Sequence, residues 1–512
     1  MKKLGLSIGD IKAAYKGVKH KAKLAAKKGN YEQSLQLVRH CATIAQQFNW
    51  IYADEELEDL LKDISAKIIT TSTEPYIPAE NRVVLYDDFC VSFILALQYI
   101  EALVEAGKEV LYMTVAQQSG KFSSIISTIE KNYPQVKILI IPNAIRVELA
   151  KEIHKEIIAF QPEKVLFHIF ANSVSVPAIY ALPSEIDTYI INLADQTFWL
   201  GAKAIKYVLE FRQFGVSVSQ QRRGIKPQQQ LLVPFYPIVD NNPFQGFPKE
   251  CIEEGKVLIF SGGDIYKVLD DKRMYWHLVK RLLDTFPEVV FLFATKEDGF
   301  GIKFLRSFIC DNHFEGRFIY TKFRPDINEV LAHADIFMGT CPVCGSLMSQ
   351  LAARNATPIL QYYYPGTPDD ETEQAICINE KFSISFQDEE LFMQEAEKLI
   401  KDAAYRKQQG ERLRNAMIAI PQFNKLVADT LSFNKTQIPL KPFEMDYKQL
   451  DDRWFALEKA GFLNTMPYLY GLLGKKNCIK FASILYLKKQ MNTIITLFDT
   501  TKITSSNNET NN

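Results

Sequence analysis

The segment ADIFMGTCPVCGSLMSQLAARNATPIL, residues 334–360, contains the alternation that decides the fold. A short apolar run, IFM, is followed by a loop of small residues, a helical stretch from Leu347 to Ala353, and a second apolar run after Pro358. A strand, a helix and another strand in one short segment are typical of a βαβ unit, in which the two strands are parallel. The segment therefore predicts part of a parallel sheet.

The same alternation extends in both directions from this segment. Apolar runs of strand length recur between helical patterns, first as RVVLYDD (82–88), EVLYMTV (109–115), VKILIIP (136–142), KVLFHIF (164–170) and TYIINLAD (188–195), then as KVLIFSGG (256–263), EVVFLFAT (288–295) and RFIYTK (317–322). The two series are separated by the Pro-rich bridge 231–250. The predicted fold class is α/β, with two Rossmann-like, doubly wound parallel-sheet domains and helical additions at both ends.

The length of 512 residues exceeds what one hydrophobic core usually supports. We predict a helical N-terminal cap (1–75), an N-terminal Rossmann-like domain (81–235), a C-terminal Rossmann-like domain (250–430), a helical segment (440–500) and a disordered polar tail (501–512). Within the cap, residues 25–45 resemble one tetratricopeptide-type helical hairpin, without the further copies that an array needs.

The charge balance argues against a nucleic-acid binder, because 60 basic and 60 acidic residues give a formal net charge of zero. One local exception is the Lys-rich stretch from Lys2 to Lys28, which is either a solvated helical face or a surface for peripheral membrane association. No secretory signal and no run long enough to span a membrane is present, and the eight cysteines are scattered. We therefore expect a cytoplasmic protein with reduced thiols.

In doubly wound sheets, ligands bind beyond the carboxyl ends of the strands. Ser261, Gly262 and Gly263 follow an apolar strand directly, and Lys267 lies one turn further on. Small residues let backbone amides approach a phosphate, and a lysine adds a positive charge. This segment predicts a phosphate-binding turn; the alternative is an ordinary connection between a strand and a helix.

A second small-residue turn precedes the helix that begins near Leu347. Cys344, Gly345 and Ser346 lie where free amides and the helix dipole favour an anion, such as a diphosphate. The alternative is a simple helix cap. Cys341 and Cys344 also form a CxxC pair, but no second pair of ligands lies nearby, so we predict no metal site.

Polar residues also end the strands of the first domain. Asp87 and Asp88 follow one strand, His168 lies in another, and Asp195 and Gln196 end a third. A carboxylate or imidazole at such a position can accept a proton from a hydroxyl. We place Asp195 first and His168 second as catalytic candidates, although a histidine inside an apolar run is often simply part of the core. Asp87, Asp88 and Gln196 are predicted to line the acceptor side.

Charged residues near the hinge and in the loop after the strand TPIL (357–360) complete the candidate set. Arg212, Arg222 and Arg223 are either phosphate clamps or part of a solvated basic loop. Asp370 and Glu371 are either ligands of sugar hydroxyls or a solvated start of a helix.

Taken together, these segments resemble bacterial glycosyltransferases of the GT-B fold, in particular those of surface or capsular polysaccharide gene clusters. The resemblance covers about residues 82–428 and is carried by strand-end segments such as NLADQTFWLGAKAIKYVLEFRQFG (192–215), RRGI (222–225), FSGGDIYK (260–267) and the segment quoted first. It implies a hexosyltransferase that binds a nucleotide-diphosphate sugar as substrate in the second domain and a glycan or lipid-linked acceptor in the first. It implies neither a metal nor a cofactor.

By this resemblance, Gly262, Gly263 and Lys267 contact the donor diphosphate, Cys344, Gly345 and Ser346 cap it, and Asp195 lies at the reaction centre. Retaining members carry two glutamates around the second glycine turn, and the matching positions here are Pro342 and Gln350. Their absence favours an inverting enzyme, in which Gln350 still binds a ribose or sugar hydroxyl. Two other functions remain open: a nucleotide-sugar epimerase of the same fold, and a non-catalytic scaffold in a polysaccharide assembly complex. The sugar, the nucleobase, the acceptor and the linkage are not predicted.

Overall fold

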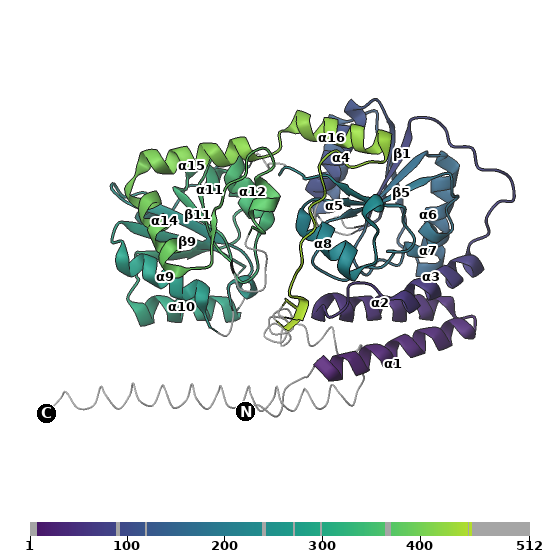
Figure 1. The fold of residues 1–512 in the computed structure, drawn as a ribbon, viewed down its shortest axis with the longest axis horizontal. Coiled ribbons are helices and arrows are strands. Elements are labelled where there is room, and N and C mark those ends of the chain that lie inside the picture. Colours follow the sequence, from purple (N-terminus) through teal and green to yellow (C-terminus); the bar gives the residue numbers. More distant parts are fainter. Residues whose placement is uncertain are drawn as a thin grey trace.

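The computed structural model contains two α/β lobes, one built around each predicted sheet (Figure 1). It describes residues 8–88, 93–117, 120–237, 242–269, 272–296, 299–363, 370–448 and 450–452.

The N-terminal lobe contains a parallel sheet of seven strands in the order β3-β2-β1-β4-β5-β6-β7. Its strands are β1 (Arg82–Asp87), β2 (Glu109–Val115), β3 (Lys137–Ile141), β4 (Lys164–His168), β5 (Asp187–Asn192), β6 (Tyr207–Glu210) and β7 (Gln230–Leu232). The C-terminal lobe contains six strands in the order β10-β9-β8-β11-β12-β13. These are β8 (Val257–Gly262), β9 (Val289–Ala294), β10 (Phe318–Thr321), β11 (Ile336–Met338), β12 (Ile359–Tyr362) and β13 (Ser385–Phe386). Both orders contain the Rossmann series 3-2-1-4-5-6, which confirms the predicted fold class.

Helices cover both faces of each sheet, so both lobes are doubly wound. In the N-terminal lobe, one face packs against α1 (Ile8–Lys27), α2 (Tyr31–Phe48), α3 (Glu55–Ile68), α6 (Arg146–Phe160) and α7 (Val176–Tyr180). The other face packs against α4 (Phe93–Glu105), α5 (Gly120–Asn132) and α16 (Ile420–Phe433). In the C-terminal lobe, α9 (Met274–Thr285), α10 (Gly299–Asn312) and α14 (Glu389–Lys401) cover one face, and α11 (Ile327–His333), α12 (Ser346–Arg354), α13 (Glu373–Ile376) and α15 (Ala403–Ala416) cover the other. The remaining elements are α8 (Gln213–Arg222) and the short 3₁₀ turns η1 (Pro227–Gln229), η2 (Lys249–Cys251) and η3 (Ile265–Val268).

The apolar runs named above all form strands. In β1, β2, β8 and β9, five or six consecutive residues are buried, as suits a parallel sheet that is covered on both faces. Three strands were not predicted: β6, β7 and β13. Each has four residues or fewer, and β7 overlaps the start of the bridge, whose prolines predicted a linker. All three extend the Rossmann order at one edge of their sheet.

Residues 8–68 form three helices, α1, α2 and α3. The first two pair as a hairpin, and the Tyr15 hydroxyl and Lys19 ammonium both donate to Asp54, at 2.6 and 2.8 Å, at the start of α3. Buried Glu58 accepts the Gly201 amide at 2.8 Å, which ties the cap to the loop after β5. The cap is therefore packed on the lobe and is not a separate array.

After the second sheet, the chain returns to the first lobe (Figure 1). In α16, Phe423 packs against Tyr99 and Tyr236, with ring centroids 5.6 and 5.3 Å apart. The chain then follows α8, where the Lys441 amide donates to Gln213 Oε1 at 2.7 Å. Most of the predicted helical segment 440–500 and the whole predicted tail lie outside the described residues. Among the helices that the structure describes, none has the length and apolar character needed to cross a membrane.

Replacing Gly410 by alanine tests the packing of α15 against the turn that follows α12. A Cβ atom there would lie 1.8 Å from the carbonyl oxygen of Ala356, a backbone atom that cannot rotate away. We expect Gly410→Ala to destabilise the protein by about 1–3 kcal/mol in thermal or urea unfolding. Gly17→Ala in α1 is the matched control, because no atom lies within 4 Å of its added Cβ. Equal stability of the two variants would contradict the prediction.

Candidate functional site

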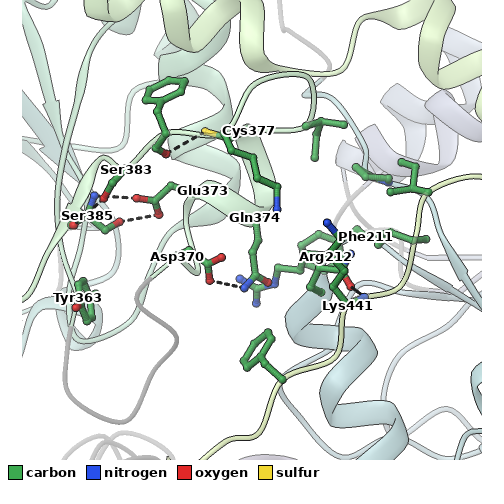
Figure 2. A pocket seen from close by; sticks show the side chains of 18 residues that line it. Phe211, Arg212, Tyr363, Asp370, Glu373, Gln374, Cys377, Ser383, Ser385 and Lys441 are labelled. Atoms are coloured by element: carbon green, nitrogen blue, oxygen red, sulfur yellow. Dashed lines mark hydrogen bonds between the residues drawn. The ribbon is translucent and has the colours of Figure 1, made fainter.

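The carboxyl ends of the two sheets meet at a cavity of about 560 Å³ between the lobes (Figure 2). From the first lobe it is lined by Phe211 and Arg212, which follow β6, and from the second by residues that follow β12 or belong to β13, such as Tyr363 and Ser385. The returning chain supplies Lys441. Doubly wound sheets bind ligands at this edge, so the cavity is the candidate site.

Arg212 connects the two lobes at this site. Its Nε and Nη2 atoms donate to the two carboxylate oxygens of Asp195 at 2.6 and 3.0 Å. Its Nη1 atom donates to Glu371 Oε1 of the second lobe at 3.1 Å. Burial alone would lower the pKa of Arg212, but Asp195 and Glu371 raise it overall. The guanidinium therefore stays charged and is held in one orientation by a bidentate pair.

The close approach of α8 to the sheet explains this orientation. A Cβ atom at Gly215 would lie 2.4 Å from Glu210 Oε2 and 3.0 Å from Asp195 Cβ, so only glycine fits at this position. Glu210 is fully buried, which raises its pKa, and its Oε2 accepts a hydrogen bond from Asn192 Nδ2 at 2.7 Å. The Phe214 amide donates to Gln374 Oε1 at 2.7 Å, a second contact between the lobes.

This arrangement changes the interpretation of Asp195, our first catalytic candidate. Its side chain has no exposed surface, and Arg212 engages both of its oxygens. Asp195 therefore does not face a substrate in this structure, and its two contacts hold the Arg212 guanidinium in place. Arg223 is also buried and donates to the Asp195 carbonyl at 2.7 Å, whereas Arg222 pairs with Asp451 at 3.1 Å, away from the cavity lining.

His168, the second catalytic candidate, is buried beneath the same edge of the sheet. Its Nδ1 lies 3.0 Å from Asp87 Oδ1, and the Tyr112 hydroxyl donates to Asp87 Oδ2 at 2.9 Å. The side chains of both His168 and Asp87 are at most 1% exposed, so neither reaches a substrate directly in this structure. The pair supports the residue that follows Asp87 in the chain.

That residue is Asp88, which is only partly buried and accepts hydrogen bonds at the edge of the lobe. Its carboxylate receives the Phe170 amide at 2.8 Å and the hydroxyl of Ser173. Burial raises the pKa of Asp88 to about 6, although these two hydrogen bonds partly oppose the increase. A carboxylate with a pKa near 6 suits a general base at neutral pH.

In the first predicted phosphate turn, two of the polar groups already make hydrogen bonds within the protein. The Tyr275 hydroxyl donates to Ser261 Oγ at 2.6 Å, and the Gly263 amide donates to the Ala294 carbonyl at 2.9 Å. Gly262 is the last residue of β8 and packs closely on Ala294. The Lys267 ammonium has no hydrogen-bond or ion-pair partner among the described residues. Lys267 is therefore the group of this turn that is available to an anion.

The second predicted turn lies beside the first. The Val343 amide donates to the Lys267 carbonyl at 3.2 Å, so the loop before α12 packs against η3. Gly345 caps α12, and Ser346 is its first residue. Cys344 Sγ lies 3.1 Å from Thr372 Oγ1, and burial raises the pKa of this thiol to about 11. The two turns therefore lie side by side at the carboxyl edge of the second sheet.

Gln350 does not take the place expected of it, whereas Asp370 lines the cavity and Gln196 contacts the cap. Gln350 is fully buried, and its Nε2 donates to the carbonyls of Phe235 and Ala375 at 3.0 and 2.9 Å, so it does not face a ligand. Asp370 lines the cavity and accepts Gln374 Nε2 at 2.5 Å. The carbonyl of Gln196 accepts from Asn49 of the cap at 2.6 Å.

Several lining residues were not singled out from the sequence. They are Phe211, Gln213, Tyr363, Gln374, Lys381, Ser385 and Lys441. For Phe211 and Gln213 a signal existed, because they flank Arg212. For Lys441 there was none, since its position depends on the return of the chain along α8.

No protein-family model matches the chain, and no curated protein matches it in sequence. Solved structures with a similar arrangement include a mutant O-GlcNAc transferase from Thermobaculum terrenum, with 11% identity, a TM-score of 0.49, and coverage of 86% of this chain and 84% of that one. They also include UDP-GlcNAc 2-epimerase from Neisseria meningitidis bound to UDP-GlcNAc, with 11% identity, 69% and 100% coverage, and a TM-score of 0.45. HepE from Anabaena in complex with UDP has 12% identity, 69% and 100% coverage, and a TM-score of 0.48. Similarity at this level assigns no family and no activity to this chain.

Proposed function

We propose that the protein is a glycosyltransferase that transfers a sugar from a nucleotide-diphosphate donor to a hydroxyl acceptor. The observation that carries this proposal is the convergence of two Rossmann-like carboxyl edges on one cavity, with residues of both lobes in its lining. Two sheets that share a cleft can hold donor and acceptor on opposite sides. The polysaccharide context and the cytoplasmic location belong to the same proposal.

The donor belongs on the second lobe in this proposal. Lys267 and the amides before α12 neutralise the diphosphate, which removes the need for a metal ion as the leaving group departs. Arg212 is a second candidate phosphate ligand at the boundary between the lobes, where its Nη1 atom donates to Glu371 before the donor binds. Asp370 remains a candidate ligand of the sugar hydroxyls.

The acceptor belongs on the first lobe, with Asp88 as the general base. Deprotonation of the acceptor hydroxyl by Asp88 allows the oxygen to attack the anomeric carbon while the nucleoside diphosphate leaves. Asp87 and His168 lie directly behind Asp88, where the Asp88 amide donates to the His168 carbonyl at 3.1 Å. These two residues fix the position of the base.

The experiment that tests this function combines calorimetric titration with UDP and other nucleoside diphosphates with NMR of the corresponding nucleotide sugars. A glycosyltransferase is expected to bind one diphosphate and to hydrolyse its sugar slowly when water replaces the acceptor. Interconversion of two nucleotide sugars without hydrolysis would identify an epimerase. If none of the nucleoside diphosphates binds, a non-catalytic scaffold remains as the function.

Replacing Lys267 by alanine tests the donor side. We expect the affinity for the diphosphate to fall by about 1.5–3 kcal/mol, the usual contribution of a charge-assisted hydrogen bond. Lys256→Ala is the matched control, because Lys256 precedes β8 at the opposite edge of the sheet, where its ammonium donates to the Pro287 carbonyl at 3.2 Å. Calorimetry measures both affinities, and an equal loss in the two variants would remove Lys267 from the site.

A further inference from the structure

The chain that returns from the second lobe forms a third wall of the cavity. Ile438, Lys441 and Phe443 belong to this wall, and the two lobes supply the other lining residues. Residues 436–446, which we call the strap, follow α16 and run along α8 toward the cap (Figure 1). The structure describes every residue of the strap, and none of them lies in a helix or strand. The position of the strap therefore depends on its contacts with α8.

Neutral side chains on one side of α8 hold the strap by its backbone. Gln213 Oε1 accepts a hydrogen bond from the Lys441 amide at 2.7 Å. Ser217 Oγ accepts one from the Phe443 amide at 3.0 Å, and Gln221 Nε2 donates to the Phe443 carbonyl at 2.8 Å. The three helix residues are four positions apart, so they form one row along α8. Each bond joins uncharged groups and is therefore of ordinary strength.

The side chains of the strap add little to this attachment. None of them is buried, and exposed residues such as Lys441, Pro442 and Glu444 alternate with half-buried ones such as Phe443 and Met445. Segments with few buried apolar side chains open locally at a lower free energy than the core around them. The strap therefore belongs to the less stable part of the molecule.

Both ends of the strap are held by stronger contacts than its middle. Before it, Asn434 Nδ2 donates to Asp187 Oδ2 at 2.7 Å. Beyond it, Arg222 lies over the Tyr447 ring, 4.4 Å from the ring centroid, and pairs with Asp451 at 3.1 Å. Contacts to charged groups are stronger than hydrogen bonds between neutral groups. A segment that is fixed at both ends and weakly held between them can leave α8 and return to the same place.

The other walls of the cavity are joined to each other directly. Arg212 of the first lobe donates to Glu371 of the second at 3.1 Å, and the Phe214 amide donates to Gln374 Oε1 at 2.7 Å. Moving one lobe away from the other would break both contacts, whereas moving the strap would break neither. The strap is therefore the wall of the cavity that is displaced at the lowest cost.

We propose that the strap is a gate of the cavity, which leaves α8 to admit a ligand and docks again when the ligand is bound. A ligand in the cavity contacts Ile438, Lys441 and Phe443 only when the strap is docked, so ligand binding and docking stabilise each other. The opening itself does not rest on the proposed transfer reaction. The choice of a nucleoside diphosphate as the ligand does rest on it.

The experiment measures hydrogen exchange of the Lys441 and Phe443 amides in the full chain, by mass spectrometry at single-residue resolution. If the strap opens as one unit, both amides have the same protection, which we expect to be well below that of the amides in β1 and β8. Ser217→Ala removes the acceptor of the Phe443 amide alone. It should nevertheless speed exchange at both amides by about fivefold, the effect of one ordinary hydrogen bond. Faster exchange at Phe443 alone, or protection equal to that of the core strands, would overturn the proposal.

Ser34→Ala is the matched control. Ser34 is as fully buried as Ser217, and its hydroxyl donates to the Ala22 carbonyl at 2.8 Å within the cap. This change removes a hydrogen bond of the same kind without touching the strap, and exchange at the two strap amides should stay unchanged.

A second arm repeats the exchange measurement with UDP at a concentration that calorimetry shows to be saturating. Bound UDP should slow exchange at both strap amides by about fivefold or more, a typical coupling between two linked equilibria. UDP that binds without slowing them would show that the strap is not a gate. If UDP does not bind, the proposed donor is wrong, and the response of the two amides to Ser217→Ala still decides whether the strap opens.

Discussion

Asp195→Asn is expected to destabilise the protein by about 3–5 kcal/mol, the cost of leaving a buried charge without its partner. The Arg212 guanidinium is 4% exposed and cannot lose its proton to escape the penalty. Glu371 contacts only Nη1 and belongs to the other lobe, so it replaces little of the bidentate pair. Urea unfolding of the variant and of the parent protein measures the difference.

The control is Asp370→Asn, which removes an exposed carboxylate from the lining of the cavity between the lobes. We expect this change to leave the free energy of unfolding almost unaltered. Adding Arg212→Gln to Asp195→Asn removes the unpaired charge and should recover part of the lost stability. If Asp195→Asn instead unfolds like the parent but loses transfer activity, the residue acts chemically, as the sequence suggested.

Most of the fold could be predicted because it depends on local patterns. A buried parallel strand needs a continuous apolar run, and runs such as those of β1, β8 and β9 are visible in the sequence without any knowledge of their neighbours. The edge strands β6, β7 and β13 are too short to produce this pattern. They form because an existing sheet offers them a partner, which is information about tertiary structure.

The site was harder to predict because it depends on contacts between distant residues. The sequence predicted Asp195 at the end of a strand, and the structure has it in the turn that follows β5. Whether a carboxylate there is a base or half of an ion pair depends on Arg212, which reaches it only because Gly215 lets α8 approach the sheet. The same reason hid the role of Gln350, whose partners lie in the bridge and after α12. Residue type and strand position identified the edge of the sheets at which the site lies, but they did not identify the chemical role of each residue.

Asp88→Asn is expected to reduce turnover by about 10²–10⁴-fold, the usual contribution of a general base. The change is nearly isosteric and keeps an oxygen that accepts from the Phe170 amide, so the fold and the affinity for the nucleotide should be retained. Before the acceptor is known, turnover is measured as the rate of donor hydrolysis, which is monitored through release of the nucleoside diphosphate. A loss of nucleotide affinity in parallel with turnover would contradict the assignment.

The pH profile separates a base from a residue that only supports the loop. Burial raises the pKa of Asp88 to about 6, so the carboxylate is protonated below that pH, and turnover should fall as the pH is lowered through about 6. The Ser173 hydroxyl donates to this carboxylate and holds its pKa down. Ser173→Ala should therefore move the fall in turnover to higher pH, because the ionised form loses a hydrogen bond. A structural role for Asp88 predicts no such movement. An unchanged pH profile of turnover in Ser173→Ala would therefore show that Asp88 is not the general base.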